Sequence, residues 1–173
     1  MPEAHEHQIR SFVRMLWHDE YLYSIDAPLM PARRHPRHTV LHDRHALISH
    51  ARVTRDQVKH LGETLEMCCL GDVLTYPSFR GKGHGTMVVA AATKVIQEDS
   101  KADAAILFTE PENAEFYGRH GWQARPDLKV VVGLPNGRDP TYGLPMMLFL
   151  SDPAAAMRRD FESTILELPG YGW

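Results

Sequence analysis

Several features that define common protein classes are missing from this sequence. Two cysteines occur among its 173 residues, and they are adjacent, Cys68 and Cys69. Neighbouring strand residues point to opposite faces, so neither a structural disulfide nor a CxxC metal pair is available, and a reducing, cytoplasmic setting is expected. No apolar run reaches the roughly 18 residues of a membrane span, and the N-terminus MPEAHEHQIR is too polar for a signal peptide.

An excess of positive charge is also missing. The 19 basic residues are outnumbered by 22 acidic ones, which gives a net charge of -3, so no nucleic-acid partner is expected. Arginines do gather between residues 33 and 55, but no aromatic ladder accompanies them. Two explanations remain for these arginines. They form a positively charged entrance that attracts the phosphates of a ligand, or they are simply solvated.

Histidines concentrate near the start of the chain, where nine of the eleven lie in residues 1–60. His38, His42, His45 and His50 lack a carboxylate or cysteine partner at the spacing of metal ligands. We therefore expect surface and hairpin histidines and no metal site.

The length suits a single domain, residues 1–173, and a hydrophobic fraction of 43% is ordinary for a globular protein. Periodicity and turn residues predict its elements. Helices are expected at residues 4–18, 87–98 and 112–120 and from residue 152; strands at 39–41, 46–53, 65–75, 104–108, 129–133 and 146–150; loops at 24–37 and 134–142; and an apolar tail at 165–173. The strand, helix and strand of residues 65–108 predict a parallel crossover.

The rest of the chain can be read around residues 65–86, LEMCCLGDVLTYPSFRGKGHGT. Alternation places Leu65, Met67, Cys69 and Val73 on one face of a strand and Leu70 and Leu74 on the other. Gly81, Gly83 and Gly85 then let the backbone bend and come close to a ligand, and the first N–H groups of the next helix have no intrahelical partners. Such a place binds phosphate.

Spacing decides which phosphate ligand fits. A Walker loop needs Ser or Thr after its lysine, but Gly83 follows Lys82, and a dinucleotide fingerprint needs glycine where Thr86 stands. The pattern R-x-x-G-x-G, formed by Arg80, Gly83 and Gly85, does fit. It resembles the acetyl-CoA pyrophosphate loop of the GNAT superfamily of N-acetyltransferases. A glycine-rich turn that only ends a strand is the alternative.

The resemblance implies a cofactor site. Backbone N–H groups of residues 81–86 hold the pyrophosphate, and residues 73–75 pair with the pantetheine arm. The implied acyl-CoA contacts are Val73, Leu74, Thr75, Arg80, Gly81, Lys82, Gly83, His84, Gly85, Thr86 and Asn113.

A second motif follows about thirty residues later. Residues 112–122 read ENAEFYGRHGW and resemble the second cofactor motif of the same superfamily, a hydrophobe and tyrosine followed by x-x-x-Gly-aromatic. The resemblance makes Tyr117 the general acid at the acyl-CoA sulfur, or a residue that merely packs beside the cofactor. Both motifs together imply an α/β (α+β) fold with a mixed, mostly antiparallel sheet, a central parallel strand pair splayed around acyl-CoA, and helices on both faces.

Acetyl transfer to an amine needs an oxyanion donor, an acid and a base. A backbone N–H near Leu74 is expected to stabilise the oxyanion, and Tyr117 to protonate the leaving thiolate. Asp72 and Glu66 have the same parity, so they share a face unless a bulge intervenes, and Glu110 ends the second parallel strand. Any of the three can take the proton of the amine; the alternative is that they are solvated carboxylates.

Within the superfamily, residues 38–75 resemble aminoglycoside 2′-N-acetyltransferases, as does a chain that ends in tryptophan. Tyr171 stands where that family has an aspartate, and arginines at 33, 34 and 37 replace its acidic loop. A small primary amine, met by Glu110, Tyr171 and Trp173, is therefore expected rather than a polycationic drug. An aminoglycoside acceptor and a non-catalytic, regulatory acyl-CoA-binding domain are the alternatives. The oligomeric state is left open, with a homodimer among the options.

Overall fold

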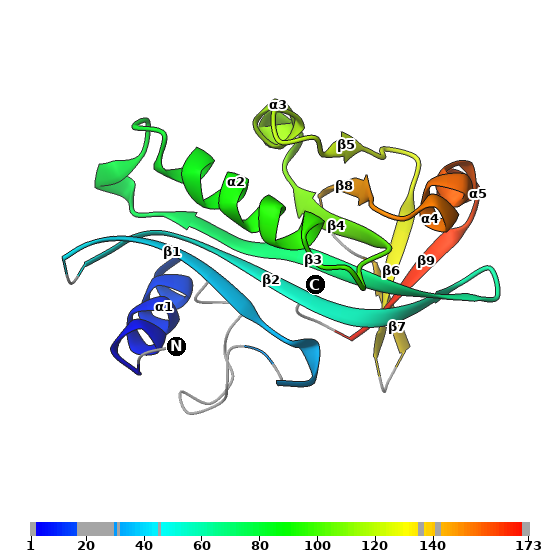
Figure 1. Cartoon of the computed structure of the whole chain (residues 1–173), viewed down its shortest axis with the longest axis horizontal. Coiled ribbons are helices and arrows are strands. Elements are labelled where there is room, and N and C mark those ends of the chain that lie inside the picture. The colour runs from blue at the N-terminus through cyan, green and yellow to red at the C-terminus, as the bar shows by residue number, and fades with distance from the viewer. Residues whose placement is uncertain are drawn as a thin grey trace.

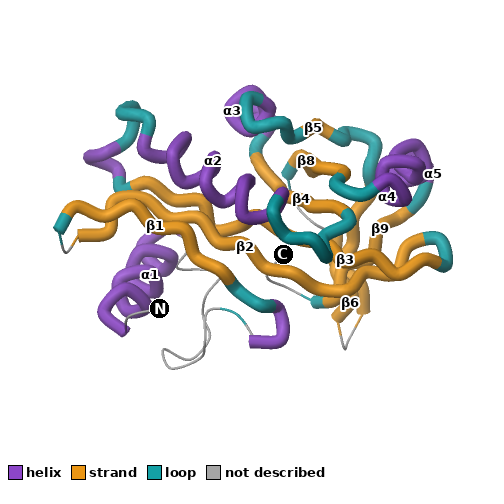
Figure 2. The backbone as a smooth tube through the Cα atoms, in the orientation of Figure 1, coloured by secondary structure: helices purple, strands orange, loops and turns teal. Residues whose placement is uncertain are grey.

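A six-stranded sheet forms the centre of the protein, as Figures 1 and 2 show. The computed structural model describes residues 3–16, 30, 32–44, 46–134, 137–140 and 143–170. The strand order is β1-β2-β3-β4-β8-β5. The bounds are β1 Arg37–Asp43, β2 Ala46–His60, β3 Glu63–Thr75, β4 Ala104–Thr109, β5 Gln123–Ala124 and β8 Leu144–Phe149.

The pairing within this sheet is antiparallel except between β3 and β4. These two strands run parallel and pair through Met67–Cys69 and Ala104–Ile106. Beyond that point β4 slants toward α3 while β3 continues toward the start of α2 (Figure 1). The predicted fold class, a mostly antiparallel mixed sheet with one central parallel pair, is confirmed.

A smaller sheet, order β7-β6-β9, was not expected. It consists of β6 Lys129–Leu134, β7 Gly137–Pro140 and β9 Ile165–Pro169. The prediction of a loop at residues 134–142 was therefore wrong at β7, and the apolar tail contains a strand. In β9 the buried Leu166 and Leu168 alternate with the exposed Ile165 and Glu167, so a period of two was present in the tail.

Helices cover both faces of the large sheet. On one face lies α2 (His84–Gln97), which packs on a cluster containing Cys68 and Leu70. On the other face, α1 (Glu3–Leu16) buries Ile9. A separate cluster that contains Cys69 is covered by α4 (Asp152–Ala156), α5 (Asp160–Ser163) and the small sheet. The two cysteines therefore point to opposite faces, as predicted.

The other predicted helices and strands are present with shifted ends, whereas most of the predicted loop at 24–37 and the last two residues of the predicted helix 4–18 lie outside the described residues. The α2 helix begins three residues before the expected start at residue 87, and the predicted helix at 112–120 is a 3-10 turn, Pro111–Asn113, followed by α3 (Ala114–Gly118). Within the described residues, no helix combines the length and apolar character needed to cross a membrane.

Candidate functional site

The glycine loop joins β3 to α2 and leaves the helix start uncapped by any side chain. Gly81 and Gly83 adopt positive φ angles of 75° and 80°, which other residues rarely adopt. Gly83 is the N-cap of α2, and it provides no side-chain oxygen to accept a hydrogen bond from the first turn. The first N–H groups of the helix are therefore available to an anion.

Gly85 serves a different purpose, because its φ angle is not in the left-handed region. An ideal Cβ at this position would lie 3.3 Å from Oγ1 of Thr75 and 3.7 Å from Cζ of Phe116. The absence of a side chain thus lets the first turn of α2 pack on the end of β3 and on α3. The two sequence motifs meet at this point.

Two exposed cations flank the loop. Nε of Arg80 donates to the carbonyl oxygen of Thr75 at 3.1 Å, and Nζ of Lys82 donates to that of Ser78 at 3.3 Å and lies over the ring of Phe79. Both side chains are held at the loop by its own backbone. Their charges favour a bound pyrophosphate over a neutral ligand.

A bulge changes the geometry of β3 just before the loop. His50 pairs with Leu74 and Arg52 with Gly71, so two residues of β3, Asp72 and Val73, oppose the single residue between them on β2. Asp72 takes a positive φ of 48°, a conformation that Asp tolerates better than most residues.

The bulge reverses which face the later residues occupy. Val73 packs with Leu70 on the α2 side, whereas Leu74 packs with Ile9 on the α1 side. The predicted face assignment of Val73 and Leu74 was therefore wrong, because alternation along a strand shifts at an inserted residue.

The end of β3 is anchored on one edge and open to pairing on the other. Ser49 Oγ, which is buried, donates to the carbonyl of Leu74 at 2.7 Å and lies 2.8 Å from Oγ1 of Thr75. Since the pairing with β4 stops at Cys69, the backbone of residues 73–75 on that edge can pair with an extended ligand.

Tyr117 lies at the carboxyl end of β4. It packs against the α2-side cluster, and its ring meets that of Phe116 edge-on. Burial raises the pKa of Tyr117 to about 12, and a hydrogen bond with Thr109, the last residue of β4, opposes this less strongly. The phenol therefore stays protonated at neutral pH and can act as a donor. In the same motif, Trp122 is buried and donates to Thr93 Oγ1 at 3.1 Å, so it serves packing.

Asp72 and Glu66 do not share a face, because the bulge intervenes. Asp72 forms a buried ion pair in which its carboxylate lies 2.7 Å from Nε of Arg52. The exposed fractions of the two side chains are 8% and 2%. The Asp72 carboxylate is thus held inside the protein by Arg52 and is not exposed to an incoming amine.

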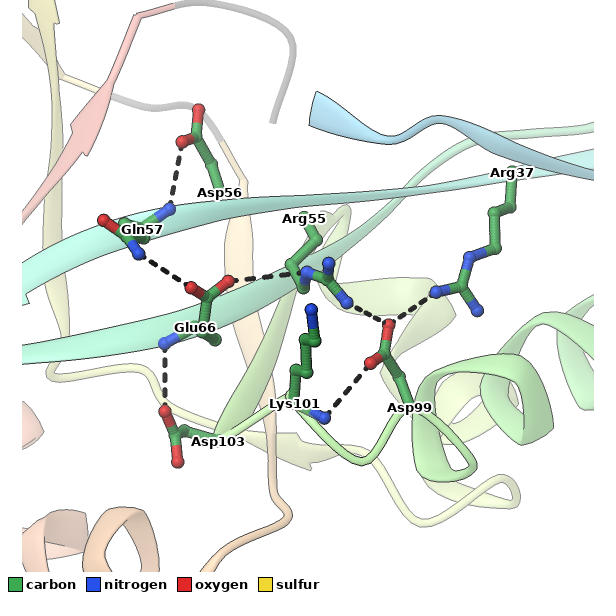
Figure 3. Close-up of polar contacts among 8 residues, drawn as sticks. All are labelled: Arg37, Arg55, Asp56, Gln57, Glu66, Asp99, Lys101 and Asp103. Atoms are coloured by element: carbon green, nitrogen blue, oxygen red, sulfur yellow. Dashed lines mark hydrogen bonds and ion pairs between the residues drawn. The ribbon is translucent and has the colours of Figure 1, made fainter. Parts of the chain in front are cut away.

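Glu66 lies near the other end of β3 within a polar network drawn in Figure 3. Its carboxylate is 3.4 Å from Nε of Arg55 and accepts from Gln57 at 2.8 Å, while its backbone N–H donates to Asp103. Seven strand residues at about 3.3 Å each, roughly 23 Å, separate it from Val73. Glu66 therefore lies far from the glycine loop, and its expected role as a base stays an untested prediction.

The network continues from Arg55 to Asp99, which follows the end of α2 (Figure 3). Asp99 also pairs with Arg37 at 2.6 Å, and Arg33 and Arg34 lie 3.3 Å from Asp56. With the Arg52–Asp72 pair, five of the arginines between residues 33 and 55 thus form ion pairs at sites other than the glycine loop. These ion pairs do not form a cationic entrance at the loop, although the side chains of Arg33 and Arg37 remain exposed.

The other expected residues fall in three groups. Glu110 follows β4 and is exposed, and Asn113 ends the 3-10 turn before α3, so both lie beside the carboxyl end of β4. Tyr171 and Trp173 lie outside the described residues.

His50, expected at the surface, is fully buried and forms a pair with the half-buried His38, which the sequence did not reveal. The register of the β1–β2 hairpin places His38, His50 and Arg52 on one face. Alternation along the predicted hairpin could therefore have indicated that the two histidines lie close together.

Comparison with known proteins agrees with this geometry. Residues 1–125 match the family model described as "Acetyltransferase (GNAT) domain". No curated protein matches the sequence.

Solved structures share the fold at low identity. An acyl-CoA N-acyltransferase from Pseudomonas aeruginosa is 16% identical over 85% of this chain and 91% of its own, with a TM-score of 0.58. Escherichia coli ElaA is 15% identical with the same coverage and a TM-score of 0.59. A probable N-acyltransferase from Enterococcus faecalis V583 is 18% identical over 72% of this chain, with a TM-score of 0.58; the match covers 31% of that longer protein. The family match spans most of the sequence and includes both cofactor motifs, so this chain belongs to the GNAT family of acetyltransferases, which bind acyl-CoA.

Proposed function

We propose that this protein transfers an acetyl group from acetyl-CoA to a primary amine of a small molecule, by direct attack within a ternary complex. The observation that supports this most is that the glycine loop, the edge of β3 beyond its pairing with β4, and Tyr117 all lie at the carboxyl ends of β3 and β4. An anion site, an extended backbone edge and a proton donor are the three features that a phosphorylated thioester cofactor requires.

The residues present fit acetyl-CoA, which supplies the activated acetyl thioester. Backbone N–H groups of residues 81–86 would hold the pyrophosphate, with Arg80 and Lys82 beside it. Residues 73–75 and Asn113 would hold the pantetheine arm.

The reaction needs few side chains. A backbone N–H near Leu74 would stabilise the negative charge on the attacked carbonyl oxygen, and Tyr117 would protonate the departing thiolate. No covalent intermediate on cysteine is needed. Burial raises the pKa of both Cys68 and Cys69 to about 12, so they remain unreactive thiols.

Of the three carboxylates considered as base, Glu110 is the best placed. It follows Thr109, the hydrogen-bond partner of Tyr117, and it is exposed to solvent. We propose that it takes the proton of the amine, directly or through water. Asp72 is held by Arg52, and Glu66 lies at the far end of its strand.

The acceptor is proposed as a small monoamine. Arg33, Arg34 and Arg37 are ion-paired, so their repulsion of a polycation is weaker than the sequence suggests. Neither the family model nor the structures named above identifies an aminoglycoside acceptor. A screen of aminoglycosides against monoamines and amino-acid derivatives tests the preference, and robust turnover of an aminoglycoside would refute it.

The competing function is a non-catalytic domain that binds acyl-CoA. A binder has no need for a proton donor at the sulfur, and Tyr117 is such a donor. The test measures acetyl-CoA binding by calorimetry and thiol release with an amine panel. Tyr117→Phe should lower kcat by about a hundredfold and leave acetyl-CoA affinity unchanged. Tyr76→Phe, which removes an exposed phenol from the side of the loop near α1, is the matched control. Binding without turnover of any amine would favour the competing function.

A further inference from the structure

A buried histidine contacts the backbone carbonyl of Asp72, a residue of the bulge in β3. Nδ1 of His50 lies 2.8 Å from the carbonyl oxygen of Asp72. A carbonyl can only accept, so Nδ1 of His50 carries the proton. His50 is 0% exposed, so water does not replace this contact.

A second histidine fixes the orientation of the first. Nδ1 of His38 lies 2.9 Å from Nε2 of His50, and the two rings stack with centroids 5.2 Å apart. With the proton of His50 on Nδ1, its Nε2 is the acceptor and His38 donates. The chain of donors runs from His38 on β1 through His50 on β2 to Asp72 on β3.

The surroundings keep this chain neutral. Burial lowers the pKa of His50 to about 4, against smaller raising effects of Asp72, and burial followed by the charge of Arg52 lowers the pKa of His38. The charged groups that face the pair are Arg52, Asp72 and, from α1, Glu6. A doubly protonated His50 would present a second N–H to the donor of His38 and would break the chain.

We propose that His50, oriented by His38, is a positioning residue that holds the end of β3 in the register needed by the acyl arm of CoA. This inference rests on the proposed function. Asp72 directly precedes residues 73–75, and the bulge sets which face these residues occupy. Losing the anchor on its carbonyl allows the bulge to relax, and a shift of one residue would turn Val73 and Thr75 away from α2.

Two variants and two ligands separate positioning from general stability. His50→Leu removes both hydrogen bonds, whereas His50→Asn keeps the donor, because its amide nitrogen is the same number of bonds from Cα as Nδ1. Acetyl-CoA would reach the end of β3 through its pantetheine arm, whereas adenosine 3′,5′-bisphosphate carries only the phosphorylated adenosine part and lacks that arm. We expect His50→Leu to weaken acetyl-CoA binding about tenfold and adenosine 3′,5′-bisphosphate binding less than twofold, and His50→Asn to restore most of the loss.

His38→Leu provides a second route if His50→Leu does not fold. It leaves the anchor but removes the group that orients it, so a smaller loss confined to acetyl-CoA is expected. His42→Leu, at an exposed histidine near the end of β1, is the control. Equal weakening of both ligands, or unchanged acetyl-CoA affinity in folded His50→Leu and His38→Leu, would overturn the inference. If the wild type binds no acetyl-CoA, the proposed function fails first, and the inference with it.

Discussion

An ideal Cβ on Gly85 would lie 3.3 Å from Oγ1 of Thr75, so the first turn of α2 rests directly on the last residue of β3. This close approach brings the N–H groups of the helix start to the end of the strand that would hold the pantetheine arm. The anion site and the backbone edge thereby become one continuous surface.

The loop itself can be tested at Gly83. In Gly83→Asp, a carboxylate would take the place of the missing N-cap side chain and repel pyrophosphate. No atom lies within 4 Å of the added Cβ, so the fold should survive. We expect calorimetry to show at least a hundredfold weaker CoA binding.

Gly62→Asp is the matched control for that experiment. Gly62 also has a positive φ, 88°, and open space around its Cβ, but it lies in the turn between β2 and β3. Both variants should lose a similar amount of thermal stability, about 1 kcal/mol, from the strained backbone. Unchanged CoA affinity in Gly83→Asp would move the phosphate site elsewhere.

The raised pKa of Tyr117 leads to a prediction about kcat at alkaline pH. Burial raises its pKa to about 12 from an ordinary value of 10, so the phenol remains a proton donor as the pH rises through 10. The kcat with a small amine should therefore show no alkaline loss due to this residue between about pH 9 and pH 11. A loss with an apparent pKa near 10 that disappears in Tyr117→Phe would contradict this prediction.

The lowered pKa of His50 leads us to expect a smaller free energy of unfolding in mild acid. The unfolded chain binds a proton at the ordinary pKa of 6.5, whereas folded His50 binds it at about 4. The stability is therefore fully present above pH 6.5 and falls as the pH is lowered toward 4, by roughly 3 kcal/mol.

Urea denaturation of wild type and His50→Asn at a series of pH values checks this. The slope of unfolding free energy against pH should be shallower in the variant, because asparagine binds no proton. Parallel slopes would mean that His50 is not buried in its neutral form.

Glu66 should matter for stability and not for catalysis. Glu66→Gln weakens its contact with Arg55 at the far end of β3. The pair is partly exposed, so a loss of up to about 1 kcal/mol in chemical denaturation is expected, with kcat unchanged. Glu110→Gln is the matched variant, and it should lower kcat with little effect on stability. A fall in kcat with Glu66→Gln would restore it as a candidate base.

Local patterns in the sequence determined much of this protein. The hairpin of β1 and β2, the helix α2, the buried strand β4 and the position of the glycine loop all follow from periodicity and turn residues over short stretches. The spacing of the loop and of the Tyr117 motif also predicted the family. These features depend on neighbours along the chain, which is the information that one sequence contains.

The tertiary structure decided the rest, because it depends on pairing between distant segments. The inserted residue at Asp72 is visible only in the register of β3 against β2, and it reversed the faces of Val73 and Leu74. Pairing of β1 with β2 likewise brought His38 and His50 together. A sequence specifies which residues alternate, but the partner strand decides where the alternation shifts.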